Sequence, residues 1–256
     1  MAGASVVAPA RAADVVSSNI VGYQRLDIPA NGYALLANPF VEVGTGSTTP
    51  VGYAINEMFT DDTDNSTAAN AATAADQIQV WDATTQGYST YFFSSRVSTG
   101  KAWATVAKPR DAATTTFDFG DGYWYLNRGS EAYSLTVSGE VSTKEVVVTL
   151  EPGYTLICNP FPADLPLNSE NIDWATAGST PANAATAADQ IQLWNAETQG
   201  YTTYFFSGRT TPANQWASVG APRVATTDVI PAGQGAWYLN RGASAITITL
   251  KSPLAD

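Results

Sequence analysis

The sequence predicts an all-β protein built from two tandem homologous antiparallel β-sandwich domains of the jelly-roll or Ig-like kind. Three observations predict this fold class. Residues 70–96 reappear almost unchanged at residues 183–209. Apolar and polar residues alternate along short segments, and turn-forming residues separate these segments. Alternation with a period of two is typical of strands that have one face in a core and the other toward solvent.

The internal repeat sets the expected domain boundaries. The two 27-residue stretches differ at only five positions. Shorter segments match as well: "GYALLANPF" at 32–40 matches "GYTLICNPF" at 153–161, and "GYWYLNRG" at 122–129 matches "GAWYLNRG" at 235–242. We therefore expect a leader remnant or N-terminal strand at residues 1–16, a first repeat at 17–141 and a second repeat at 142–256.

The N-terminal segment predicts export. "MAGASVVAPARA" ends in Ala10-Arg11-Ala12, an A-x-A pattern of the small residues that signal peptidase reads. The mature chain would begin near Ala13 and be secreted, either extracellular or held at the cell surface. No stretch reaches the roughly 18 apolar residues that a transmembrane helix needs, so we expect no membrane span.

The remaining elements follow in chain order. Residues 13–28, which precede the turn at Pro29–Gly32, are expected to form a strand that a neighbouring subunit could receive. Single helical turns are expected in "GYAINEMF" and "NSENIDWA", and a hairpin turn at Gln86-Gly87. Strands are expected at 132–138, 145–150 and 245–251, with Ile246, Ile248 and Leu250 on one face of the last.

The chain also resembles a known type of module. "PGYTLICNPFP" is followed by "IQLWNAETQGYTTYF" and then by "IPAGQGAWYLNRG". This order is similar to a repeated β module of exported and cell-surface bacterial proteins, a poorly characterised family. The resemblance covers both repeats and implies a fold and a location rather than a chemistry. The first repeat departs from the pattern at "FDFGDG", where "IPAGQG" stands in the second.

Composition excludes several classes of function. The net charge is −11, with 12 Lys and Arg against 23 Asp and Glu, which argues against nucleic acid as a partner. There is no histidine, so catalytic triads and common zinc sites are ruled out. Within the matched regions only Asp76 and Asp189 recur as acids, and we expect them to accept backbone N–H bonds. The protein is therefore expected not to be an enzyme, and the single Cys158 is expected to be a buried apolar residue.

An acidic cluster in the first repeat offers one possible metal site. Asp61, Asp62 and Asp64 carry hard oxygen ligands at close spacing, which calcium prefers. The EF-hand spacing and its distal Glu are absent, and the second repeat has no counterpart. The alternative is a solvated loop tip, and calcium is the one cofactor the sequence suggests.

The recurring polar and aromatic residues of the repeated hairpin are the candidate interaction residues. Trp81 lies on the polar face with Gln77 and Gln79, opposite Ile78, and the second repeat preserves this pattern. The full set is Trp81, Trp194, Gln77, Gln79, Gln190, Gln192, Tyr91, Tyr204, Arg96 and Arg209. A recent duplication would explain their identity, and so would two hairpins that meet the same kind of surface. One hypothesis is self-assembly into a homopolymer, a filament or a surface layer; the alternative is adhesion through exposed aromatic residues that bind a polysaccharide.

Overall fold

The computed structural model describes residues 20–41, 52–58, 65–142 and 144–254. Across these residues the protein is all-β, with several antiparallel sheets and three helices of three or four residues. The predicted leader at 1–16 and the acidic cluster Asp61, Asp62 and Asp64 lie outside the described residues.

The first repeat contains nine strands in its described part. Their bounds, with those of the helical turns, are β1 (Val21–Ile28), β2 (Tyr33–Ala37), β3 (Tyr53–Ala54), α1 (Ile55–Met58), η2 (Ala72–Ala74), β4 (Gln77–Asp82), β5 (Gly87–Ser94), β6 (Ala102–Thr105), β7 (Thr116–Phe117), β8 (Gly122–Leu126) and β9 (Tyr133–Glu140).

Among its described residues, the second repeat contains nine strands and one helix that follow the same order, without a counterpart of η2. Their bounds are β10 (Val146–Leu150), β11 (Gly153–Cys158), β12 (Leu165–Pro166), α2 (Trp174–Ala177), β13 (Gln190–Asn195), β14 (Gly200–Ser207), β15 (Gln215–Ser218), β16 (Val229–Ile230), β17 (Gly235–Asn240) and β18 (Ile246–Leu250).

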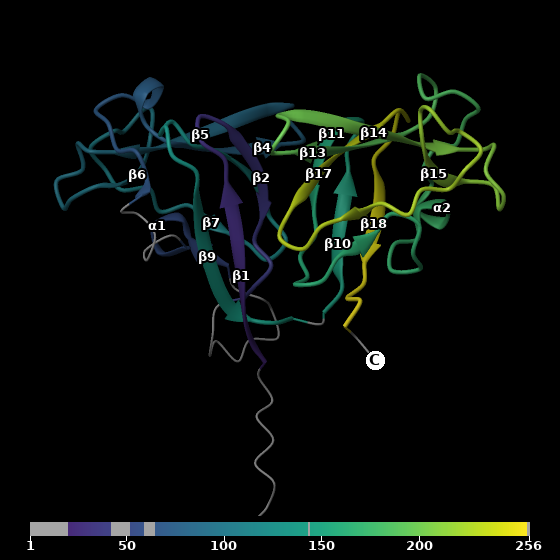
Figure 1. The fold of residues 1–256 in the computed structure, drawn as a ribbon, viewed down its shortest axis with the longest axis horizontal. Coiled ribbons are helices and arrows are strands. Elements are labelled where there is room, and N and C mark those ends of the chain that lie inside the picture. The colour runs from purple at the N-terminus through teal and green to yellow at the C-terminus, as the bar shows by residue number, and fades with distance from the viewer. Residues whose placement is uncertain (1–19, 42–51, 59–64, 143, 255–256) are drawn as a thin grey trace, which may run out of the picture.

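Each repeat is organised around one five-stranded antiparallel sheet. The strand order is β2-β8-β4-β5-β6 in the first repeat and β11-β17-β13-β14-β15 in the second. The ribbons β1–β9 and β10–β18 and the shorter pairs β3–β7 and β12–β16 complete the sheets of the described residues. The two repeats lie side by side, with the five-stranded sheets along one side of the molecule and the long ribbons beneath them (Figure 1).

A separate apolar core holds each repeat together. In the first, Leu26 and Leu135 of the β1–β9 ribbon pack with Ile78 and Tyr125 on the inner face of the large sheet. The core of the second is built in the same way and includes Ile248, from the β10–β18 ribbon. Burying apolar side chains between two layers is what stabilises such small sheets.

Most local predictions from the sequence are confirmed. The strands predicted at 132–138, 145–150 and 245–251 are β9, β10 and β18. Helical turns form within "GYAINEMF" as α1 and at the end of "NSENIDWA" as α2. The N-terminal strand is corrected: β1 pairs with β9 of its own chain, from Val21 opposite Glu140 to Ile28 opposite Tyr133, so this part is not free for a neighbour.

No helix in the described part of the chain is long and apolar enough to cross a membrane.

Candidate functional site

The two nearly identical hairpins meet at the boundary between the repeats. In the first hairpin, β4 and β5 pair with Trp81 directly opposite Tyr88, and in the second Trp194 stands opposite Tyr201. The turns have the same geometry, because Gln86 and Gln199 both adopt left-handed φ angles, of 51° and 52°. A glycine follows each of these residues and begins the returning strand.

Each hairpin forms hydrogen bonds with the edge strand of the other repeat. The Gln86 side chain accepts a hydrogen bond from the backbone N–H of Tyr154 at 3.0 Å and donates to the Tyr154 carbonyl at 2.8 Å. The indole Nε1 of Trp81 donates to the same carbonyl at 2.9 Å. The glutamine amide therefore pairs with β11 as a peptide group of a neighbouring strand would.

The second hairpin repeats this contact in the opposite direction. The Gln199 side chain accepts from the N–H of Tyr33 at 2.8 Å and donates to its carbonyl at 2.9 Å, while Trp194 Nε1 donates to that carbonyl at 3.0 Å. We call these two contacts the reciprocal clamps. They have the form of an isologous dimer interface within one chain. They also explain why Trp81, Gln86 and their counterparts are identical in both repeats.

Further contacts hold the repeats together beside the clamps. Leu36 of β2 forms an isolated antiparallel bridge with Gln234, and the N–H of Ala37 donates to the carbonyl of Gly233 at 2.9 Å. Gly122 of β8 lies so close to Cys158 of β11 that a methyl group there would overlap the sulfur. Backbone, side chains and close packing all cross the boundary, so the repeats form one continuous unit.

Eight aromatic rings form a continuous cluster along this boundary. One quartet consists of Tyr33 and Trp124 of the first repeat with Trp194 and Tyr201 of the second, and ring centroids lie 4.8–6.5 Å apart. The other quartet consists of Tyr154 and Trp237 of the second repeat with Trp81 and Tyr88 of the first. The Trp237 indole donates to the Tyr201 hydroxyl at 3.2 Å and so links the quartets.

An open cleft of about 270 Å³ lies over this cluster. Its lining is Tyr33, Gln79, Tyr88, Trp124, Trp194 and Tyr201. Tyr88 and Tyr201 come from opposite hairpins and remain 48% and 46% exposed, whereas Trp124 behind them is buried. The cleft therefore offers aromatic surface, hydroxyl groups and one amide, and none of its lining side chains is charged.

The hydroxyl groups of Tyr88 and Tyr201 stay protonated at neutral pH. Burial raises the pKa of Tyr88, and the neighbouring Tyr201 raises it further. Burial likewise raises the pKa of Tyr201, against the opposing effect of the Trp237 hydrogen bond. Both hydroxyls can therefore donate as well as accept hydrogen bonds.

The positions of the predicted tryptophans need a correction. Trp81 and Trp194 are on the polar face, as the sequence predicts, but they are partly buried against the other repeat rather than turned to an external partner. Trp124 and Trp237 share that face, because Gln79 pairs opposite Trp124 and Gln192 opposite Trp237. The face is therefore an internal boundary of the chain, with the cleft as its opening.

Two other predicted pairs lie away from this boundary. Tyr91 and Tyr204 point into the cores of their repeats and are only 9% and 4% exposed, because they alternate with Tyr88 and Tyr201 along the strand. Arg96 and Arg209 are exposed, but they follow the opposite ends of β5 and β14 from the clamps.

The glutamines on the hairpin face divide into two types. Gln77 and Gln190 fold back onto the carbonyls of Ala72 and Ala185, both at 2.7 Å, and so have a local structural role. Gln79 bonds Gln77 at 3.0 Å and lines the cleft, and Gln192 occupies the equivalent position in the second repeat.

Tyr88, Tyr201, Gln86 and Gln199 belong to the site but were not predicted from the sequence. Tyr88 stands directly opposite Trp81 across the first hairpin, and Tyr201 opposite Trp194 across the second. Counting residues outward from each Gln-Gly turn would have placed each tyrosine on the same face of the hairpin as its tryptophan. All four tyrosines of the hairpins recur in both repeats, so recurrence alone does not distinguish the exposed Tyr88 and Tyr201 from the buried Tyr91 and Tyr204.

The buried acids and the cysteine have the structural roles that the sequence predicts. Asp76 accepts from the N–H groups of Thr67 at 3.0 Å and Arg128 at 2.7 Å. Asp189 makes the equivalent backbone bonds, and both acids accept from tyrosine hydroxyls, Asp76 from Tyr133 and Asp189 from Tyr238. Cys158 is buried, and burial raises the pKa of its thiol, which makes the reactive thiolate less accessible.

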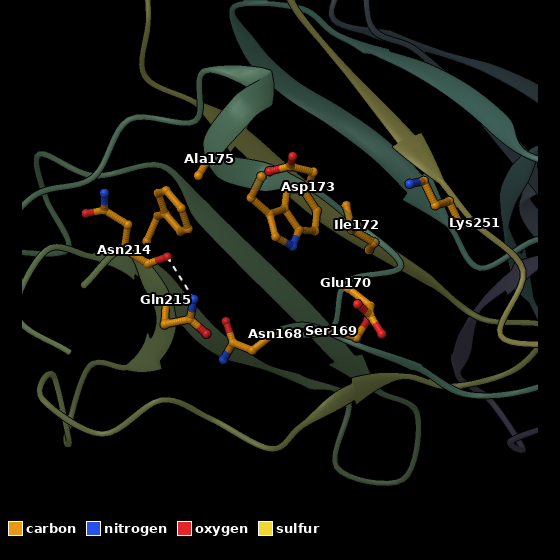
Figure 2. A pocket seen from close by; sticks show the side chains of 11 residues that line it. Asn168, Ser169, Glu170, Ile172, Asp173, Ala175, Asn214, Gln215 and Lys251 are labelled. Carbon is orange, nitrogen blue, oxygen red and sulfur yellow. Dashed lines mark hydrogen bonds between the residues drawn. The ribbon is translucent and has the colours of Figure 1, made fainter. Parts of the chain in front are cut away.

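A second cavity, of about 370 Å³, lies beside α2 in the second repeat. Asn214 and Gln215 are at one side of it and Lys251 is at the other (Figure 2). Asn168 is committed to the backbone of Trp216 and Thr226, and no exposed aromatic ring lines the cavity. This cavity is lined by charged and amide groups, among them Glu170, Asp173 and Lys251, and so differs from the uncharged aromatic cleft.

Within the described ranges, no group of three or more His, Cys, Asp or Glu side chains lies close enough together to hold a metal ion. The predicted calcium ligands Asp61, Asp62 and Asp64 are not among those residues.

No family model, curated protein or solved structure matches this chain.

Proposed function

We propose that this chain is an exported, non-catalytic carbohydrate-binding protein whose binding site is the aromatic cleft between its repeats. The observation that carries the proposal is the meeting of two half-exposed tyrosines, Tyr88 and Tyr201, over one uncharged cleft backed by Trp124 and Trp194. The C–H faces of sugar rings gain apolar burial on such rings. Their hydroxyl groups find partners in the tyrosine hydroxyls and in Gln79.

Rings of both repeats are needed to form this cleft, so binding supplies a reason for the tandem. Secretion to the cell surface or extracellular space belongs to the same proposal, on the basis of the A-x-A pattern at Ala10–Ala12 and the low content of charged residues. We also infer that each repeat is a β-sandwich domain, with boundaries at 17–141 and 142–256, which the separate apolar cores support.

A glycan array with the full chain tests the proposal. We expect retention on a subset of polysaccharides, with the signal reduced in Tyr88→Ala and Tyr201→Ala. Trp81 and Trp194 are poor choices for this test, because their indoles take part in the clamps and their loss would disturb the boundary itself. Retention of both tyrosine variants at the level of the unchanged chain would reject the cleft as the site.

A second candidate function is self-assembly of this chain into a homopolymer. The hairpin faces already cover each other, so a polymer contact would use another surface. The observation in favour is the outer face of β1, where Val21 and Tyr23 are exposed, and Val147 is exposed in the same way on β10. Exposed apolar side chains on ribbon strands are typical of contact surfaces.

Negative-stain electron microscopy tests this second candidate. We expect filaments or sheets of the unchanged chain and shorter particles of Tyr23→Ser. Monodisperse single particles at high protein concentration would reject assembly and leave the carbohydrate proposal unaffected.

A further inference from the structure

The lining of the cleft restricts the charge of its ligand. Its six side chains are neutral, and the whole chain carries a net charge of −11. A uronic acid or a sulfated sugar would approach against this charge and would find no cationic partner in the cleft. Recognition in the cleft therefore favours a neutral glycan.

The aromatic rings extend beyond the cleft toward the edge strand of the second repeat. From Tyr33, ring contacts lead through Trp124 to Tyr201, with centroid separations of 5.9 and 6.5 Å. The bond from Trp237 to Tyr201 then leads to Tyr154, whose ring centroid lies 5.9 Å from that of Trp237. This aromatic track runs from the edge strand of one repeat to the edge strand of the other. Tyr88, Tyr201 and Tyr154 are its exposed rings, and Trp124 and Trp237 lie buried behind them, so a ligand on the track would contact both repeats.

The ring orientations separate one form of ligand from another. Neighbouring rings meet nearly at right angles, at 89° for Tyr33 with Trp124 and 80° for Tyr154 with Trp237. Rings at these angles do not lie in one plane, so they do not form a single flat binding surface. They enclose a single chain from several sides, whereas the flat face of an insoluble, crystalline polysaccharide would touch few of them.

We propose that the aromatic track binds one neutral, unbranched glycan chain per protein molecule, laid across the boundary so that both repeats contact it. This inference rests on the proposed carbohydrate-binding function and specifies its ligand. Because the clamps are reciprocal, the two halves of the track present the same residue types in opposite order. Tyr88 and Tyr201 therefore contribute comparably, and reversing the glycan exchanges their roles.

Isothermal titration calorimetry of the full chain with defined hexasaccharides tests this inference. The probes are cellohexaose, xylohexaose, mannohexaose and maltohexaose as neutral chains, and hexagalacturonic acid as the acidic one. We expect at least one neutral hexasaccharide to bind with one ligand per chain, and the acidic one not to bind. Tyr88→Ala and Tyr201→Ala should each weaken binding about threefold to tenfold, the value of one aromatic contact.

Tyr23→Ala is the matched control, since Tyr23 is 81% exposed on β1 and has no place in the track. It should leave affinity unchanged. Thermal unfolding shows whether each variant is folded. If a tyrosine variant does not fold, Gln79→Ala replaces it, with a loss of about threefold, as expected for one hydrogen bond.

The outcomes distinguish this inference from the function on which it rests. If no carbohydrate binds in the calorimeter or on the array, the proposed function fails and the inference fails with it. If a neutral glycan binds at two per chain, or if only one tyrosine variant weakens it, the shared track is refuted while carbohydrate binding stands. Binding of hexagalacturonic acid alone, or of microcrystalline cellulose without any hexasaccharide, would refute the neutral single chain.

Discussion

The reciprocal clamps predict a defined loss of stability when one glutamine is shortened. In Gln199→Ala, two hydrogen bonds to the backbone of Tyr33 disappear, at 2.8 and 2.9 Å, and the exposed bond within the turn to the Ala196 carbonyl, at 2.6 Å, is exchanged for water. A net hydrogen bond is worth about 0.5–1.5 kcal/mol, and the Tyr33 carbonyl keeps its bond from Trp194. We therefore expect the free energy of unfolding to fall by about 1–2 kcal/mol.

The twin variant makes the test stricter. Gln86→Ala removes the equivalent two bonds to Tyr154, at 3.0 and 2.8 Å, and should cost the same amount. The two clamps share no partner, so the double variant should lose about 2–4 kcal/mol, close to the sum of the single losses.

Equilibrium unfolding in urea, followed by tryptophan fluorescence, measures these losses. Glu197→Ala is the control, because Glu197 lies in the same turn as Gln199 and is exposed. Its side chain forms no part of the clamp. The reasoning would be refuted if Gln199→Ala were no less stable than Glu197→Ala, or if one clamp variant lost stability and its twin did not.

Three further predictions concern the boundary and the cores. Gly122→Ala should destabilise the protein by about 1–3 kcal/mol through its clash with Cys158, and adding Cys158→Ala should restore part of the loss; Gly220→Ala, in open space, should be neutral in the same urea assay. Asp189→Asn should lower the free energy of unfolding by about 1.5–3 kcal/mol, because the carboxylate accepts three hydrogen bonds and the amide replaces one of its oxygen acceptors with an NH₂ donor. An unchanged midpoint in chemical denaturation would contradict this. Burial raises the pKa of Tyr238 above its value in the unfolded chain, so the stability that its neutral form contributes is complete below about pH 10 and is lost as the pH rises further; the free energy of unfolding should therefore fall more steeply above about pH 10 in the unchanged chain than in Tyr238→Phe, and equal slopes would count against the argument.

Local structure could be predicted from the sequence because alternation fixes which residues share a face. Ile246 and Ile248 sit toward the core as predicted, and Trp81 shares its face with Gln79. Alternation does not fix which strand lies beside which. The pairing of β4 with β8, which sets Trp124 next to Gln79, depends on contacts far apart in the chain.

The same limit applies to the contacts of the repeated hairpin and of β1. The repeated polar residues of the hairpin indicated a common target, but nothing in their spacing showed that this target was Tyr33 and Tyr154 of the same chain. Likewise the sequence of β1 predicted a strand that pairs with another strand, and its partner is β9 of the same chain. A periodic pattern describes the surface that a segment offers and carries no information about which segment covers it.

The covering of Tyr33 and Tyr154 has a consequence for a solitary repeat. Both residues belong to outermost strands, β2 and β11, whose outward backbone groups would otherwise invite pairing with strands of stray chains. The side-chain amide of a glutamine in the other repeat forms hydrogen bonds with those backbone groups. Because it is a side chain and not a strand, it cannot continue the β-ladder. Each repeat thus covers part of the other's edge-strand backbone, and cutting the chain between the repeats would leave these groups open to pairing.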